Sequence, residues 1–259
     1  MTNIHLSRDG HVLRAVIDRP GDDLNRVDHG LHSELAALFA QLRHESEARA
    51  VLLSANGRAF SAGGDFAWMP SFQDPVVAEA MRRDAKQMIW DLLDVPLPIV
   101  AAVNGPAVGL GATIALLCDC IVAASDATFV DPHVRVGIVA GDGGTVAWPL
   151  ALGPALAKRY LLTGDPIGAE EAARFGLVTD VCPPSELEER SLALAQRLAA
   201  GAPLAIRYTK LAVNNLVKQA MATSFDVATA YEMVTFQSDD HAEALAALRE
   251  KRPPRFEGR

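Results

Sequence analysis

The sequence predicts an α/β protein that ends in a wholly helical region. Short apolar runs bounded by turn residues, which are typical of buried strands, alternate with segments whose apolar residues recur at helical spacing. After Pro203 the helical pattern continues to Arg252 without a strand candidate. No linker, repeat or low-complexity stretch separates the two regions. We therefore expect an α/β core at residues 1–200 and a helical region at residues 201–259.

Two strands and two helices are predicted before residue 95. His11–Ile17 is a strand candidate bounded by Gly10 and by Pro20, and Ala50–Ser54 is a short buried strand candidate. The first helix is predicted from the spacing of Leu31, Leu35, Leu38, Phe39 and Leu42, and the second from Met81, Ala85, Met88, Leu92 and Leu93. On the first helix or at its ends, we expect His29, His32 and His44 to be solvated.

An uncharged stretch runs from Val95 to Cys118 and is long enough to span a bilayer. It contains a GxxxG pattern at residues 105–109, which is also found in membrane helices. Several residues break its first half, however, and no basic loop flanks it: Pro96, Pro98, Asn104, Gly105 and Pro106. The favoured interpretation is a buried strand at Ile99–Val103, a turn, and a buried helix from Gly109 to Cys118.

The rest of the core alternates in the same way. The predicted strands are Cys120–Ala124 and Leu177–Val181, and the predicted helices are Pro154–Leu162, Ala169–Phe175 and a segment that ends near Gly201. Ser185 and Glu188 have the spacing of a capping box for that last helix. Asp119 is expected to have a structural role at the end of a buried helix.

Composition excludes several classes of protein. A net charge of −8 argues against a nucleic-acid or anionic-membrane surface, because phosphate binding requires clustered Lys and Arg. Three cysteines are too few for a disulfide framework, and Cys118 and Cys120 lack the second pair that a zinc site needs. The N-terminal residues have no apolar signal core. We expect a cytoplasmic protein with small, buried cysteines.

Two glycine-rich turns follow buried strands. Phe60–Phe66 contains Gly63 and Gly64, and Val108–Thr113 opens a helix. Free N–H groups at such turns can bind a negative oxygen, so two turns that point to one place form an oxyanion hole. The alternative is that both turns serve packing alone. A dinucleotide-binding loop is disfavoured because the third glycine is missing, and there is no GxSxG, Walker A or HExxH motif.

The order of several motifs resembles the enoyl-CoA hydratase/isomerase (crotonase) family over essentially the whole chain. The matching stretches are Ile17–Pro20, Leu24–Asn25, Ala59–Phe66, Ile99–Gly111, Leu117–Asp119, Gly143–Thr145, Leu162–Gly164 and Glu250–Phe256. The resemblance implies a spiral of repeated ββα units with a C-terminal helical trimerisation region, and a homotrimer or a homohexamer built as a dimer of trimers. It implies an acyl-CoA substrate, with no separate cofactor and no metal. The oxyanion donors would be the backbone N–H groups of Gly64 and Leu110.

The sequence departs from this family where its hydratases carry two catalytic glutamates. Thr113 occupies the first position, and Asp131-Pro132-His133 occupies the loop of the second. A Thr hydroxyl can hydrogen-bond a water, whereas His133 can act as a base near neutral pH. Asp142 is offset by one residue from an aspartate used by some family isomerases and a dehalogenase. The alternative role of His133 is to cap the loop with its imidazole. The alternative role of Asp142 is to hydrogen-bond the backbone of its own turn. For Asp131 we favour a structural role.

The resemblance also assigns residues to coenzyme A and the acyl chain: Arg26, Ala62, Asp65, Phe66, Pro132 and Lys251. Lys251 would reach the phosphates, often those of a neighbouring subunit; its alternative role is a favourable charge at a helix C-terminus. A lysine that commonly precedes the Leu-Asn motif is absent, and Gly21-Asp22-Asp23 stands there instead.

We therefore predict an acyl-CoA enzyme that stabilises a thioester enolate and carries out a hydratase- or isomerase-type reaction with a non-standard base, His133, Asp142 or both. Two alternatives stay open. One is that the protein binds acyl-CoA without catalysis. The other is that it catalyses another reaction of the family, such as decarboxylation or hydrolysis.

Overall fold

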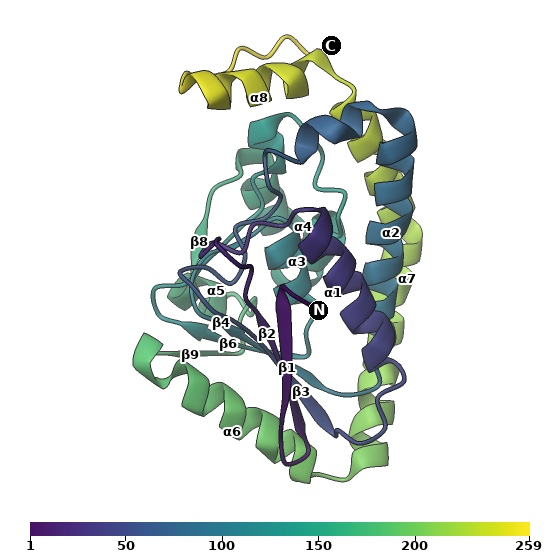
Figure 1. The fold of residues 1–259 in the computed structure, drawn as a ribbon, viewed down its shortest axis with the longest axis vertical. Coiled ribbons are helices and arrows are strands. Elements are labelled where there is room, and N and C mark those ends of the chain that lie inside the picture. Colours follow the sequence, from purple (N-terminus) through teal and green to yellow (C-terminus); the bar gives the residue numbers. More distant parts are fainter.

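Six strands form the main sheet of the computed structural model, which describes residues 1–259 (Figure 1). Their order is β1-β2-β3-β4-β6-β9, with β1 antiparallel to β2 and the other pairs parallel. The bounds are β1 Ile4–Asp9, β2 Val12–Ile17, β3 Ala50–Ala55, β4 Ile99–Val103, β6 Cys120–Ala124 and β9 Asp180–Cys182. Every residue of β4 is buried, as expected for a parallel strand covered on both faces.

The chain also forms a second, smaller sheet of three short strands. It consists of β5 (Ala107–Val108), β7 (Thr128–Val130) and β8 (Ile167–Gly168), with β5 parallel to β7 and β7 antiparallel to β8. Phe129 in β7 is completely buried and belongs to the same hydrophobic core as the main sheet. Because successive chain segments contribute to both sheets, the chain winds as a spiral of strand and helix units.

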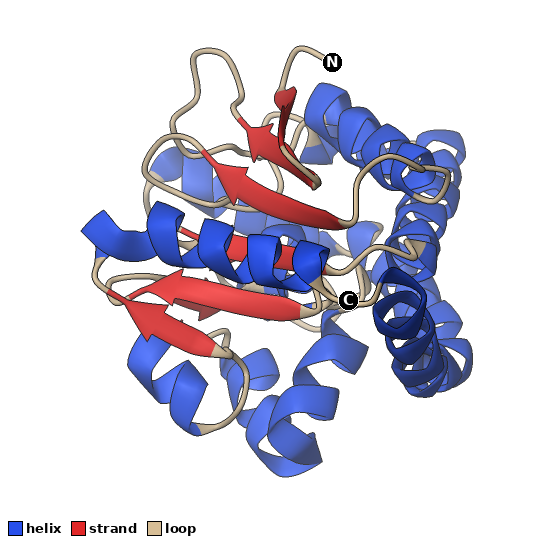
Figure 2. Cartoon of the chain, turned by 90° about the horizontal axis from the view of Figure 1, so that it is seen from below, coloured by secondary structure: helices blue, strands red, loops and turns tan.

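Helices cover the sheets on several sides (Figures 1 and 2). Helix α6 packs across β3, β4 and β6, while α1, α2 and α7 form a layer at one side of the sheet. The helices are α1 His29–Leu42, α2 Pro75–Asp94, α3 Leu110–Leu116, α4 Gly144–Thr163, α5 Ala169–Arg174, α6 Leu187–Ala200, α7 Pro203–Phe236 and α8 Asp239–Glu250, with short 3₁₀ turns η1 Met69–Gln73, η2 His133–Val136 and η3 Pro184–Glu186.

Local sequence explains where three of the helices begin. The side chain of Asp28 accepts a hydrogen bond from the N–H of Leu31 and caps α1. Asp74 caps α2 in the same way, and Pro75 follows it at the first helical position. Ser238 caps α8. The polar residues that precede the apolar patterns therefore fix the start of these three helices.

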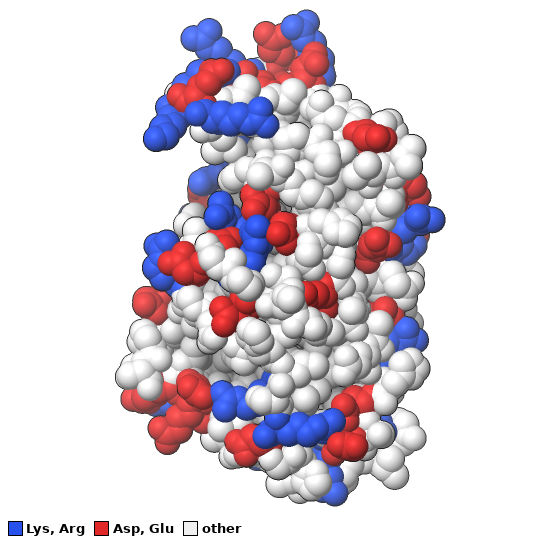
Figure 3. All heavy atoms as spheres, viewed as in Figure 1, with Lys and Arg blue, Asp and Glu red and all other residues white.

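The C-terminal helices extend the molecule beyond the core. Met221 and Phe225 of α7 pack with Ile89 and Leu93 of α2 in a cluster of their own. Helix α8 and the C-terminus lie at one end of the molecule, and charged residues of both signs gather there (Figures 1 and 3). On the face shown in Figure 3, Lys and Arg are interspersed with Asp and Glu and form no continuous basic stripe.

Most sequence-predicted elements are confirmed, and the exceptions have physical reasons. Strand β1 was not predicted because only Ile4 among its residues is buried, so the edge strand has no apolar pattern. The predicted capping box is wrong: Ser185 lies within η3, and α6 begins without a side-chain cap. Helix α4 begins ten residues before the predicted Pro154, and Gly153 breaks its helical backbone.

The uncharged stretch from Val95 to Cys118 forms β4, β5 and α3 within the core. No helix combines the length and apolar character that crossing a bilayer would require. Cys118 and Cys182 are buried, Cys120 is half-buried, and all three are free thiols. Asp119 accepts a hydrogen bond from the N–H of Ile99 at 2.7 Å, in agreement with its predicted structural role.

Candidate active site

The two glycine turns lie side by side. Ser61 pairs in parallel with Ala107, and the N–H of Val108 donates to the carbonyl of Ser61 at 2.9 Å. Gly63 has a φ of +76°, and a Cβ there would lie 2.9 Å from the carbonyl oxygen of Val108. A Cβ on Gly111 would lie 2.7 Å from the Cβ of Ser61. Glycine is therefore required at both positions for the turns to approach so closely.

The N–H groups of Gly64 and Leu110 have no backbone acceptor, and both residues line one cavity. Leu110 is the first residue of α3, where an N–H cannot bond within the helix. Beside Gly64, the pairing with Val27 uses the carbonyl of Gly63 and the N–H of Asp65, which leaves the N–H of Gly64 free. Two unbonded backbone donors thus meet at the wall of the same cavity.

This cavity has a volume of about 80 Å³ and a mixed lining. Its apolar wall comes mainly from η1, α2 and the end of α7, whereas its polar groups are two imidazoles and two carboxyl groups. The apolar residues are Val27, Trp68, Met69, Phe72, Met81, Ala85, Leu110, Ile138 and Phe236, and the polar ones are His32, His133, Asp142 and Glu232. An apolar pocket with a few convergent polar groups is the usual form of a small-molecule site.

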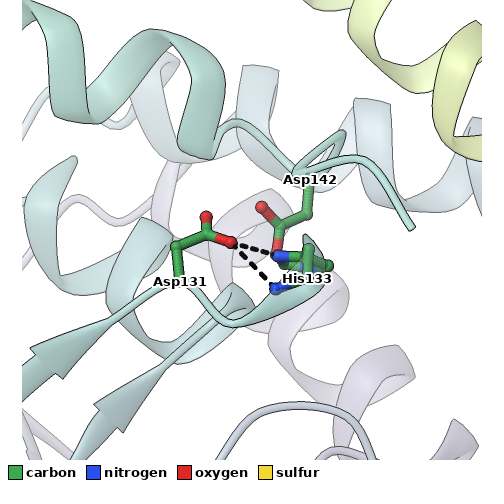
Figure 4. A group of neighbouring side chains, drawn as sticks. All are labelled: Asp131, His133 and Asp142. Carbon is green, nitrogen blue, oxygen red and sulfur yellow. Dashed lines mark hydrogen bonds and ion pairs between the residues drawn. The ribbon is translucent and has the colours of Figure 1, made fainter. Parts of the chain in front are cut away.

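Three carboxyl groups surround the imidazole of His133. Figure 4 draws two of them, those of Asp131 and Asp142. The Nδ1 atom lies 2.5 Å from Oδ1 of Asp131, which follows β7 directly. On the other side of the ring, Nε2 lies 3.6 Å from Oδ2 of Asp142 and 4.0 Å from Oε1 of Glu232. The side chain of His133 is only 12% exposed, so the surrounding water screens these charges weakly.

Glycines also make room for this cluster. A Cβ on Gly144 would lie 2.1 Å from Oδ2 of Asp131, and one on Gly141 would lie 2.5 Å from Oε2 of Glu232. Gly109 has a φ of +51°, and its missing Cβ allows the ring of His133 to pack within 3.3 Å of that position. The imidazole is therefore held directly against the turn that ends in Leu110.

The titration behaviour of the cluster follows from burial and from the mutual distances. Burial alone would lower the pKa of His133, but the negative charges of Asp131 and Asp142 outweigh it and raise the pKa to about 10. Burial raises the pKa of Glu232 to about 8 and raises that of Asp142 above its usual range. At neutral pH His133 and Glu232 therefore carry a proton, and the raised pKa of Asp142 makes it a stronger base than an ordinary aspartate.

Known proteins provide an independent comparison. The model of the enoyl-CoA hydratase/isomerase family matches residues 8–259. The chain belongs to this family. It is 34% identical over 258 residues to (E)-benzylidenesuccinyl-CoA hydratase from Thauera aromatica, which covers 98% of this chain and 99% of that protein. It is 32% identical over 262 residues to 2,3-dehydroadipyl-CoA hydratase from Escherichia coli K12, with both chains fully covered.

Solved structures of other proteins share the fold. An enoyl-CoA hydratase/isomerase from Mycobacterium paratuberculosis superposes with a TM-score of 0.90 at 36% identity, covering 95% of this chain and 98% of that one. A β-diketone hydrolase from the cyanobacterium Anabaena sp. PCC 7120 superposes with a TM-score of 0.86 at 31% identity, covering 91% and 94%. The predicted crotonase-like fold and the assignment to an acyl-CoA enzyme family are thus confirmed.

The structure brings together most of the predicted catalytic residues of this family member. Gly64, Leu110, His133 and Asp142 line the cavity. Thr113 is completely buried, and its hydroxyl donates to Oδ1 of Asp142 at 3.0 Å. The hydroxyl of Thr113 therefore orients the carboxylate of Asp142, whereas the sequence suggested that it would hydrogen-bond a water.

The residues predicted to bind coenzyme A lie outside the cavity lining. Arg26 forms an ion pair with Asp22 at 3.0 Å, and Asp65 forms one with Arg19 at 2.9 Å. The remaining predicted contacts are half-buried at Ala62 and Pro132 and exposed at Phe66 and Lys251. Their role in binding coenzyme A stays a prediction.

Two residues of the cavity were missed from the sequence. Glu232 lies on α7 and shares a face with the buried residues Phe225, Thr229 and Phe236, so its helical spacing was a usable signal. His32 was predicted to be solvated, and this was wrong: it is 6% exposed and contacts Trp68 at a ring-centroid distance of 5.6 Å. His29 and His44 are exposed, as predicted.

The cluster around His133 also has the composition of a metal site. Asp131, His133 and Asp142 each offer one ligand atom, and these atoms lie within 4.8 Å of one another. Imidazole and carboxylate ligands suit several divalent ions. In the structure, Nδ1 of His133 and Oδ1 of Asp131 contact each other directly. That the reaction proceeds without a metal stays a prediction.

Proposed function

We propose that this protein is an acyl-CoA enzyme of the hydratase/isomerase type in which the His133 cluster takes the place of the two glutamates. The observation that carries the proposal is that one cavity is lined by two unbonded backbone N–H groups and by a buried imidazole–carboxylate cluster. The N–H groups of Gly64 and Leu110 would bind the thioester oxygen. Such donors stabilise an enolate as its negative charge develops, and losing one typically raises the barrier by about 3–4 kcal/mol.

In this proposal Asp142 is the base and His133 the acid. Oδ2 of Asp142 is buried and has no hydrogen-bond partner, while Thr113 and the N–H of Gly144 hold the other oxygen. In a hydration, Asp142 takes a proton from water, the water oxygen bonds to the β-carbon, and the enolate receives a proton at its α-carbon from His133. In an isomerisation, a proton removed from the α-carbon returns at the γ-carbon. Both reactions require a proton donor and an acceptor at close range, as the 3.6 Å contact provides.

A second candidate is hydrolysis of the C–C bond of a β-dicarbonyl compound. It is favoured by the imidazole held between carboxylates, which suits the attack of water on a carbonyl, and by the likeness to the β-diketone hydrolase structure, which contains (S)-3-oxocyclohexyl acetic acid. Water would lose a proton to Asp142 and add to one carbonyl. Cleavage of the C–C bond would then release an enolate, which the N–H groups would stabilise and His133 would protonate.

Several further features stay predictions. We propose a homotrimer or homohexamer, a cytoplasmic location, no cofactor apart from the coenzyme A of the substrate, and phosphate contacts by Lys251. A protein that binds acyl-CoA without converting it is the remaining alternative, and the retained pair of free N–H groups argues against it.

A substrate screen tests the proposal. The purified protein is incubated with crotonyl-CoA, a 3-enoyl-CoA, a dienoyl-CoA, a malonyl-type CoA ester and a cyclic 1,3-diketone, and the products are identified by mass spectrometry. We expect conversion of an enoyl-CoA ester. Conversion of the diketone alone would favour the second candidate, and binding of CoA esters with no conversion would contradict both catalytic candidates.

A further inference from the structure

The imidazole of His32 is a polar group of the cavity that has no part in the chemistry proposed above. His32 lies on α1, lines the cavity and is 6% exposed. Its Nε2 atom is buried and has no hydrogen-bond partner. Buried polar atoms are nearly always paired, so an unpaired one at a cavity wall indicates that its partner arrives with a ligand.

The surroundings of His32 limit what that partner can be. Its ring contacts Trp68 at a centroid distance of 5.6 Å, and the apolar side chains of Met81 and Ala85 of α2 line the same cavity. Burial lowers the pKa of His32, so its imidazole is neutral at physiological pH. The charge of Asp84 raises this pKa and that of His29 lowers it, but neither residue lines the cavity. A neutral imidazole exchanges hydrogen bonds with an uncharged oxygen and has no charge with which to attract a carboxylate or phosphate.

We infer that His32 binds a keto or hydroxyl oxygen on the acyl chain, and that the natural substrate carries such an oxygen in addition to its reacting carbonyl. This inference rests on the proposed function, because it takes the cavity to be the acyl pocket. A buried site that hydrogen-bonds a substrate oxygen strongly rejects the analogue lacking it, since the protein group is then left unpaired. His32 would therefore determine specificity without taking part in the proton transfers.

Binding of saturated thioesters, which have no double bond to hydrate or isomerise, tests this inference separately from turnover. Isothermal titration calorimetry compares 4-oxopentanoyl-CoA with pentanoyl-CoA, and 5-oxohexanoyl-CoA with hexanoyl-CoA; the corresponding hydroxyacyl esters separate keto from hydroxyl recognition. We expect at least one oxygenated ester to bind about tenfold more tightly, or better, than its methylene counterpart. Equal binding within every pair would overturn the inference.

Variants show whether His32 causes the preference. His32→Phe keeps an aromatic ring against Trp68 and is expected to remove the preference, whereas His32→Gln keeps a hydrogen-bonding group and is expected to retain part of it. His44→Ala, at an exposed histidine just beyond the C-terminus of the same helix, is the matched control and should bind like the wild type. A His32→Phe protein that folds and retains the full preference would also contradict the inference.

The same design separates this inference from the proposed function. If no CoA ester binds the wild-type protein, the acyl-CoA proposal fails. The comparison is then repeated with (3-oxocyclohexyl)acetic acid and cyclohexylacetic acid, which test the oxygen preference without coenzyme A. Equal or absent binding of these two acids would then refute the role of His32 as well.

Discussion

The protonation of His133 depends most directly on Asp131, which makes the substitution Asp131→Asn a sharp test of the site. The two side chains meet at 2.5 Å through Nδ1 and Oδ1, and Asp131 is 1% exposed. Asparagine preserves the size of the side chain and removes its negative charge. The variant thus changes the electrostatics of the imidazole with little change in packing.

The size of the effect follows from the distance and the burial. An opposite charge within about 4 Å of a partly screened group contributes up to about 4 kcal/mol, or about 1–3 pKa units. Asp142 and Glu232 remain in the variant and continue to raise the pKa. We therefore expect the pKa of His133 to fall from about 10 in the wild type to between about 7 and 9 in Asp131→Asn.

The assay is an NMR titration of histidine side chains labelled with ¹³C and ¹⁵N, assigned by comparison with His133→Ala. The wild-type ring should remain protonated until the pH approaches 10, and the variant ring should lose its proton at lower pH. A wild-type pKa near the ordinary value of 6.5, or a pKa that does not change in Asp131→Asn, would refute the electrostatic account of the cluster.

Three further predictions concern the same cluster. We expect Asp142→Asn and His133→Ala each to lower turnover by about tenfold or more while CoA binding survives; wild-type rates in both would contradict their roles as base and acid. We expect Glu232→Gln to stabilise the protein at pH 7–8 by about 1–3 kcal/mol. The pKa of Glu232 rises from 4.5 to about 8 on folding, so its carboxyl group favours the folded state at low pH. This contribution to the free energy of unfolding is lost as the pH rises from 4.5 to about 8, and glutamine does not lose it. Urea unfolding of both proteins at several pH values would measure this, and an equally steep loss of stability in the variant would argue against it. We expect dialysis against EDTA to leave turnover unchanged; loss of activity restored by a divalent ion would instead assign Asp131, His133 and Asp142 to a metal.

Much of the fold was predictable because its core strands carry an unambiguous pattern. Ile99–Val103 and Cys120–Ala124 were predicted with their observed bounds, since both are apolar runs between clear turn or charge signals. Edge strand β1 lacks such a pattern because only one of its residues is buried, and β5 and β8 are too short, at two residues each, to show one.

The candidate site was predictable where backbone geometry determines it and less so where distant segments meet. The glycines of the two turns indicated a place where two backbone N–H groups converge, because glycine is needed for their close approach, and the resemblance to the family assigned these groups to Gly64 and Leu110. Glu232 lies ninety residues beyond Asp142 in the sequence, and no local pattern shows that α7 returns to the same cavity. His32 was misjudged because histidine is found both buried and exposed, although Leu35 and Phe39 mark its face of α1 as buried.

Exchange of the α-proton of a CoA ester tests the central claim most directly, because it reports enolate formation whichever overall reaction the enzyme catalyses. Pentanoyl-CoA and 4-oxopentanoyl-CoA are incubated with the protein in D₂O, and deuterium at the α-carbon is followed by mass spectrometry. We predict that the wild-type protein incorporates deuterium and that Asp142→Asn does so at a rate at least about tenfold lower. Absence of exchange in both esters, or exchange that is equally fast without Asp142, would contradict the assignment of this cavity as an enolate-stabilising site.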